Sequence, residues 1–258
     1  MKENHFEDDE FSLVKSVIGL LTFSTIIPLN IHTSLKNMTR MVWIWPLIHL
    51  IVGALAAACG LICLKIFHLN ILFTSVIIYV FLMIITGYNH IDGLMDMSDG
   101  VMVHGDHNKK LVIMKDSFVG AAGVTSAVLI AFLTIGGLYN ILEYNYISGI
   151  IIAEMFSKTS LLTTALKSKP TKGIGEYFIR STNWVNYSLS TIIVAIVAYL
   201  IGGYVGIIGL VGAILGGWVV SVISKRNFKV ATGDVLGASN EIGRVIALLF
   251  MSAALFYL

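Results

Sequence analysis

The sequence predicts an all-α, polytopic integral membrane protein, a helical bundle with about seven spans. Of its 258 residues, 57% are hydrophobic and only 12% are charged, and the mean hydropathy is +0.86. Soluble domains carry about 25% charged residues. We expect one membrane-embedded domain over residues 1–258, with an acidic N-terminal tail at 1–12 and lipid around it. The net charge of +2 gives no reason to expect a nucleic-acid partner.

Long apolar runs supply the expected spans, because a helix needs roughly 20 apolar residues to cross a bilayer. The run Leu189–Ser224 is nearly twice that length, so we expect it to fold back near Gly202–Gly206 and to cross twice. The other expected spans are Val42–Leu64, Ile71–Thr86, Val119–Leu142, Ile147–Leu166 and Glu241–Leu258. Val14–Leu29 is short and contains Lys15, so interfacial, re-entrant and spanning placements all stay open.

Three polar segments, Asn89–Lys115, Lys167–Asn186 and Lys225–Glu241, interrupt the apolar runs and hold ten of the seventeen basic residues. Basic residues concentrate in cytoplasmic loops of membrane proteins. An even number of expected spans separates successive segments, so all three fit on one side. The sequence therefore predicts a multi-pass cell-membrane protein whose polar segments, and any site in them, face the cytoplasm.

The first polar segment begins with the stretch His90-Ile91-Asp92-Gly93-Leu94-Met95-Asp96-Met97-Ser98-Asp99-Gly100. In a helix its three aspartates, at i, i+4 and i+7, fall within about 60° of one another on one face. Neighbouring carboxylates repel, and the stretch contains no Lys or Arg. A hard divalent cation such as Mg²⁺ is the simplest counter-charge for oxygen-only ligands.

A second polar element, Lys115-Asp116-Ser117-Phe118-Val119-Gly120-Ala121-Ala122-Gly123, opens the next span. A glycine-rich helix entry with free N–H groups suits phosphate, and Asp116 can complete a metal shell. Taken alone, such glycines are more often a packing device.

A third polar element lies at Thr232–Glu241, where Asp234, Gly237 and Glu241 share a helical face. A capped helix start is a serious competing interpretation. Elsewhere, Glu154 and Lys158 are spaced to neutralise each other inside a span, either as a structural pair or facing substrate. Cys59 and Cys63 are expected to be packing residues.

Aspartates that hold metal ions can bridge a pyrophosphate, neutralise its leaving phosphate and orient an oxygen nucleophile. Cation transporters also use intramembrane carboxylates, but place them near the bilayer centre on broken helices. The acids here follow a span end and precede phosphate-binding residue types. The pattern favours phosphotransfer over transport.

The chain resembles the adenosylcobinamide-GDP ribazoletransferases, also called cobalamin or cobalamin-5′-phosphate synthases. The resemblance rests on four stretches that occur in order across nearly the whole chain, of which the acidic one is specific. They are Thr22–Pro28, His90–Gly100, Lys115–Gly123 and Thr232–Gly237. Some positions depart from the family pattern: Thr25 and Lys115 stand where the family usually has arginine, and Gly87-Tyr88-Asn89 stands where it tends towards Gly-Gly and a small or aromatic residue.

The resemblance implies a Mg²⁺-dependent membrane enzyme that joins adenosylcobinamide-GDP to α-ribazole or its 5′-phosphate. GMP would be released, and adenosylcobalamin or its phosphate would be formed as the final assembly of the nucleotide loop. A CDP-alcohol phosphotransferase and a cation transporter are the alternatives. The phosphotransferase pattern D-x-x-D-G-x-x-A-R fails here, because no Asp precedes Asp92 by three residues and no Ala-Arg follows. Self-association into a homo-oligomer stays open.

The residue patterns and the resemblance together give the candidate site. Three aspartates are expected to be catalytic and to bind metal, namely Asp92, Asp96 and Asp99, with Asp116 as a further metal ligand. The remaining candidates are expected to bind substrate: His90, Gly93, Lys115, Ser117, Gly120, Lys172, Arg180, Asp234 and Asn240.

Overall fold

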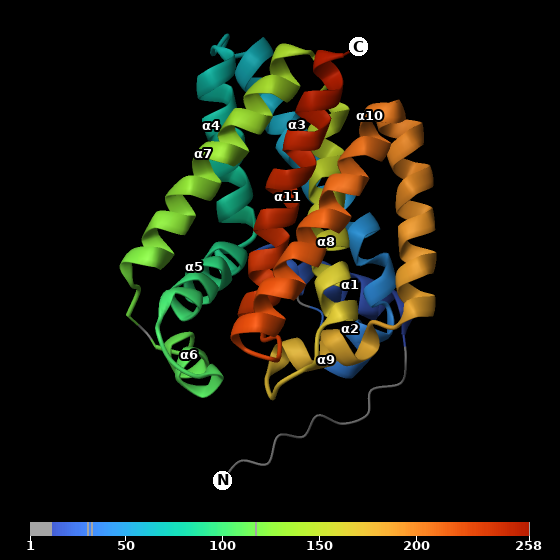
Figure 1. Cartoon of the computed structure of the whole chain (residues 1–258). Helices are drawn as coiled ribbons and strands as arrows, with labels where there is room; N and C mark the ends of the chain where they lie inside the picture. The colour runs from blue at the N-terminus through green and yellow to red at the C-terminus, as the bar shows by residue number, and fades with distance from the viewer. Residues whose placement is uncertain (1–11, 30, 32, 117, 258) are drawn as a thin grey trace.

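The computed structural model describes residues 12–29, 31, 33–116 and 118–257, and it consists of helices and their connections (Figure 1). Most of the acidic tail and Ser117 therefore lie outside the described residues. Within these ranges the only β pairing is a single bridge between Pro170 and Ala231. The all-α prediction is confirmed.

The helices follow the expected apolar runs closely. The short helices are α1 (Leu13–Ser24), α2 (Leu35–Arg40), the 3₁₀ turn η1 (Val42–Ile44), α6 (His107–Ile113) and α9 (Ile174–Ser181). The long helices are α3 (Trp45–Lys65), α4 (Ile71–Ile85), α5 (Asn89–Met102), α7 (Ala121–Glu143), α8 (Ser148–Lys167), α10 (Trp184–Asn227) and α11 (Gly233–Phe256).

Five of the described helices are long and apolar enough to cross a membrane, and the bent pair α4–α5 makes a sixth if it counts as one span. Helix α10 has 44 residues and breaks at Gly203, whose φ of 59° is outside the helical region. Its two halves run side by side in opposite directions (Figure 1). The expected fold-back in this run is thus confirmed, and α10 passes along the bundle twice.

The last helix begins earlier than expected. The sequence places the start of the final span at Glu241, whereas α11 begins at Gly233. Thr232 caps it, because its side chain accepts a hydrogen bond from the Val235 N–H. The residues of its first turns from Val235 to Glu241 are buried, and α11 packs against α5 and α8.

The three basic segments gather at one end of the bundle, as the charge pattern predicts. Lys110 Nζ donates a hydrogen bond to Asn227 Oδ1 at 2.6 Å, which joins the first segment to the third. The Ala231 N–H donates to the Lys169 carbonyl at 2.8 Å, which joins the third to the second. Polar loops from three parts of the sequence therefore form one surface.

Helix α8 lies at the centre of the bundle, between α3, α10 and α11, and is buried along nearly its whole length. The outer faces of α7 and α10 expose large apolar side chains such as Phe132 and Leu200. An apolar outer surface around a helical bundle matches contact with lipid chains.

Four buried charged groups lie inside the bundle, on α8 and α11. Arg244 Nη1 donates to Glu154 Oε1 at 3.0 Å, and Arg244 also pairs with Glu241. Lys158 donates to Asn240 Oδ1 at 2.6 Å and does not pair with Glu154, so the i, i+4 pairing suggested by the sequence is replaced by contacts between helices. Two carboxylates thus balance two cations, which buried charges require.

Candidate active site

The acidic stretch forms helix α5, as its spacing predicts, and begins at a sharp bend after α4. Gly87 and Tyr88 both adopt left-handed backbone conformations, with φ of 62° and 60°. The axes of α4 and α5 differ by 89° as a result. Helix α5 therefore turns away from the span that precedes it, and at 14 residues it is too short to cross a bilayer.

Helix α5 touches the start of α11 backbone to backbone. A Cβ atom at Gly93 would lie 2.7 Å from the Asp234 carbonyl oxygen and 2.9 Å from its Cα. A Cβ at Gly237 would lie 3.3 Å from the His90 Cα. Because Gly93 has no side chain, the backbone of α11 can approach α5 closely at this point. Asp234 therefore lies near the aspartates of α5.

The carboxylates of Asp92, Asp96 and Asp234 are close enough to influence one another's charge. Burial raises the pKa of Asp96 to about 6, and the charges of Asp92, Asp234 and Asp99 add to that rise. Asp234 also lies within electrostatic range of Lys115. Such crowded acids favour a bound cation or a bound proton.

Asp99 has different partners from Asp92 and Asp96, the other two aspartates of α5. Its carboxylate accepts hydrogen bonds from the backbone N–H groups of Gly120 and Gly123 at 2.7 and 2.8 Å. Helix α7 has no side-chain cap of its own, so Asp99 caps it from a neighbouring helix. The Gly120 N–H that the sequence offered to phosphate is therefore occupied by Asp99.

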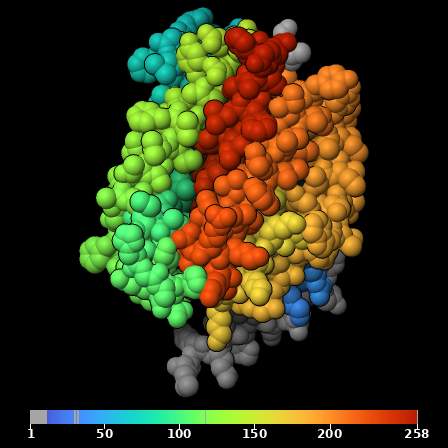
Figure 2. Space-filling view, viewed as in Figure 1, coloured from blue at the N-terminus to red at the C-terminus, as the bar shows by residue number. Residues whose placement is uncertain are grey.

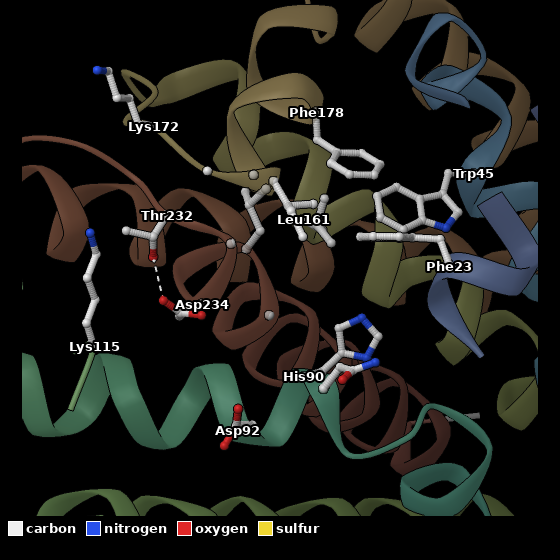
Figure 3. Close-up of a pocket in the computed structure, with 17 residues that line it drawn as sticks. Phe23, Trp45, His90, Asp92, Lys115, Leu161, Lys172, Phe178, Thr232 and Asp234 are labelled. Carbon is white, nitrogen blue, oxygen red and sulfur yellow. Dashed lines mark hydrogen bonds between the residues drawn. The ribbon is translucent and has the colours of Figure 1, made fainter. Parts of the chain in front are cut away.

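A cavity of about 490 Å³ opens beside Asp92 and Asp234. Several of the sequence-predicted residues line it, as do aromatic side chains that the sequence did not single out (Figure 3). The predicted residues are His90, Asp92, Lys115, Lys172 and Asp234, and the aromatic ones are Phe23, Trp45 and Phe178.

Three predicted residues lie away from this cavity or behind it. Asp116 is exposed in the connection before α7, where its carboxylate accepts from the Phe118 N–H. Arg180 forms an exposed ion pair with Glu176 at 2.8 Å. Asn240 is buried behind the cavity and reaches it only through Lys158, whose Nζ lies 2.9 Å from His90 Nε2.

The donor set fits a magnesium ion that is completed by substrate. Among the described residues no three His, Cys, Asp or Glu side chains converge on one point as a finished metal cage. Mg²⁺ is usually held by one or two carboxylates together with water and substrate phosphates. Asp92 and Asp234 line the cavity, Asp96 adds a third carboxylate on the same helix as Asp92, and all three supply the oxygen ligands that Mg²⁺ prefers.

The fold and site define a multi-pass membrane protein with a carboxylate cluster next to a cavity rimmed by lysines. Residues 16–252 match the model of the cobalamin-5-phosphate synthase family. The chain belongs to this family.

Curated relatives span most of the chain and share one name. An adenosylcobinamide-GDP ribazoletransferase from Pyrococcus abyssi is 32% identical over 92% of this chain and 97% of its own length. Those from Methanococcoides burtonii and from Clostridium botulinum strain Alaska are 36% and 31% identical, over 70% and 95% of this chain and 71% and 99% of their own lengths. No solved structure matches the chain.

Asp99 and Asp96 provide a test of the two different roles on α5. In metal-free buffer at pH 8, we expect Asp99→Ala to lower the free energy of unfolding by about 2 kcal/mol, because α7 loses its cap. Asp96→Ala should not lower it. A carboxyl whose pKa is raised by folding opposes folding above that pKa, so its removal is neutral or stabilising at pH 8.

Thermal or denaturant unfolding of the detergent-solubilised protein, followed by circular dichroism, measures both effects. Equal losses of stability in the two variants would contradict the capping role of Asp99.

Proposed function

We propose that the chain is a Mg²⁺-dependent adenosylcobinamide-GDP ribazoletransferase, which completes the nucleotide loop of cobalamin. Membership in the cobalamin-5-phosphate synthase family is the observation that supports this reaction, and it favours the reaction over phospholipid synthesis or cation transport. The carboxylates that α5 and α11 bring together beside the cavity support the metal.

In this reaction a free ribose hydroxyl of α-ribazole, or of its 5′-phosphate, attacks the phosphorus nearest the cobinamide. A new phosphorus–oxygen bond forms, the bond to the bridging oxygen of the pyrophosphate breaks, and GMP leaves with that oxygen. The proton of that hydroxyl goes to a carboxylate of the cluster.

Asp92 and Asp234 would be the ligands of Mg²⁺ at the pyrophosphate, with Asp96 close to them on α5. When bound, the metal neutralises the charge that develops on the leaving phosphate and lowers the barrier to attack. Lys115 and Lys172 line the same cavity and can bind phosphate oxygens as point charges. Asp99 supports the site from behind, by fixing the start of α7 against α5.

We also propose that this end of the bundle faces the cytoplasm, where nucleotide substrates are made. All three basic segments gather there, in accordance with the positive-inside rule. A Lys109→Cys variant without the two native cysteines should react with a membrane-impermeant maleimide only after cells are permeabilised. Labelling of intact cells would contradict this orientation.

Replacing one carboxylate from each helix tests the metal site. We expect Asp92→Asn and Asp234→Asn each to lower GMP release by about 100-fold or more. Each variant loses a ligand of the Mg²⁺ ion that would stabilise the negative charge of the transition state. A large excess of Mg²⁺ should restore part of the activity. GMP release from adenosylcobinamide-GDP and α-ribazole by purified protein is the measurement.

Asp106→Asn is the matched control, because Asp106 caps the exposed helix α6 and asparagine caps equally well. It should leave GMP release unchanged. Near-normal turnover of Asp92→Asn and Asp234→Asn at low Mg²⁺ would contradict the metal assignment.

A further inference from the structure

The cavity beside the carboxylates has two chemically different ends (Figure 3). The polar end holds Asp92, Asp234 and Thr232, with Lys115 and Lys172 on the same side. The other end is formed by apolar side chains, namely Phe23, Trp45, Leu161 and Phe178. A ligand that fills this cavity needs an apolar part and a polar part at opposite ends.

The apolar end is a cluster of three aromatic rings from three separate helices, α1, α3 and α9. The rings of Trp45 and Phe178 are stacked, with centroids 4.8 Å apart and planes at 27°. Phe23 adds a third ring, 5.0 Å from Phe178. Trp45 and Phe178 are nearly fully buried, whereas Phe23 keeps 38% of its surface exposed and can meet a ligand. Such surfaces bind flat heterocycles by stacking and edge contacts.

These side chains give the apolar end no spare hydrogen-bonding group. The only polar atom among the four is Trp45 Nε1, which donates to Ser24 Oγ at 3.3 Å. Ser24 Oγ in turn lies 2.9 Å from His49 Nε2. A guanine placed against these rings would have to turn its amide and amino groups toward Asn89 and His90, which also line the cavity, because groups left unpaired are costly. A dimethylbenzimidazole ring, which is flat and largely apolar, would lose few hydrogen bonds to water when it binds here.

The size of the cavity also favours the benzimidazole riboside over the corrinoid substrate as its ligand. Its volume of about 490 Å³ lies in the range of about 300–1,000 Å³ that holds small, drug-sized ligands. A riboside of benzimidazole is of that size. A corrin ring that carries an adenosyl group and GDP is several times larger and must lie mostly outside.

We propose that this cavity is the nucleophile site: the benzimidazole ring of α-ribazole lies against the exposed face of Phe23, which the stacked pair Trp45 and Phe178 supports. Its ribose then points a free hydroxyl toward Asp92, Asp234 and the two lysines. This assignment rests on the proposed function. It follows that α-ribazole binds without the corrinoid, and that the pyrophosphate of the other substrate meets the carboxylates from outside the cavity.

Calorimetric titration of the detergent-solubilised protein with α-ribazole alone tests the site directly, with its 5′-phosphate and GMP as parallel ligands. We expect α-ribazole or its phosphate to bind without Mg²⁺ and corrinoid, and GMP to bind at least about tenfold more weakly. Phe23→Ala should weaken ribazole binding about tenfold, because one ring of the cluster is lost. Phe23 is partly exposed, so its truncation spares the core.

Phe132→Ala is the matched control, since Phe132 is 69% exposed on the outer face of α7. It should bind α-ribazole like the unaltered protein. Phe178→Leu, which keeps an apolar side chain in the cluster, should weaken ribazole binding if Phe23→Ala fails to fold. In turnover assays, Phe23→Ala should raise KM for α-ribazole and leave KM for adenosylcobinamide-GDP unchanged.

Three results would overturn the assignment. They are tighter binding of GMP than of α-ribazole, an unchanged ribazole affinity in the folded Phe23→Ala and Phe178→Leu variants, and a rise in KM for the corrinoid alone. Failure of the proposed function is distinguishable, because the unaltered protein would then release no GMP with both substrates and Mg²⁺ present.

Discussion

The contact between helices α5 and α11 at Gly93 is the constraint on which the site depends. Any side chain at position 93 would collide with the Asp234 backbone, at 2.7 Å from its carbonyl oxygen. Because the two backbones touch, carboxylates 142 residues apart in sequence, Asp92 and Asp234, lie beside one cavity. The same contact aligns the polar start of α11 with the lysines that precede α7 and α9. Figure 2 shows the upper part of α11, in red, lying between α7 in green and α10 in orange.

The rest of the bundle holds that contact in place. The left-handed residues Gly87 and Tyr88 turn α5 across the end of the bundle, and Asp99 fastens it to α7. Behind the cavity, Lys158 connects His90 on α5 to Asn240 on α11. Polar groups inside a membrane bundle are costly unless they find partners. Here the hydrogen bonds and ion pairs between α5, α8 and α11 offset the cost of burying these groups. The same contacts fix the geometry of the site.

Most of the fold and part of the site could be predicted from the amino-acid sequence. Span positions followed from run length, and the common side of the basic segments followed from charge. Contacts between distant helices could not be predicted from the sequence. Glu154 pairs with Arg244 instead of with Lys158. Asp99 accepts hydrogen bonds from the N–H groups that were expected to bind phosphate. Trp45 and Phe178 carried no local signal, since aromatic residues are common in membrane helices. Phe23 lies within the Thr22–Pro28 stretch that resembles the family, which is the one hint the sequence offered.

In the proposed reaction, the carboxylates beside the cavity hold Mg²⁺ on the pyrophosphate of adenosylcobinamide-GDP. Replacing a non-bridging oxygen of the reacting phosphate by sulfur tests that contact most directly, because sulfur binds Mg²⁺ poorly and Cd²⁺ well. We expect GMP release from one thio-substituted diastereomer to fall sharply with Mg²⁺ and to be restored by Cd²⁺. In Asp92→Asn we expect no restoration by Cd²⁺. Equal rates with Mg²⁺ for the oxygen substrate and both thio-substituted diastereomers would contradict a contact between Mg²⁺ and the pyrophosphate.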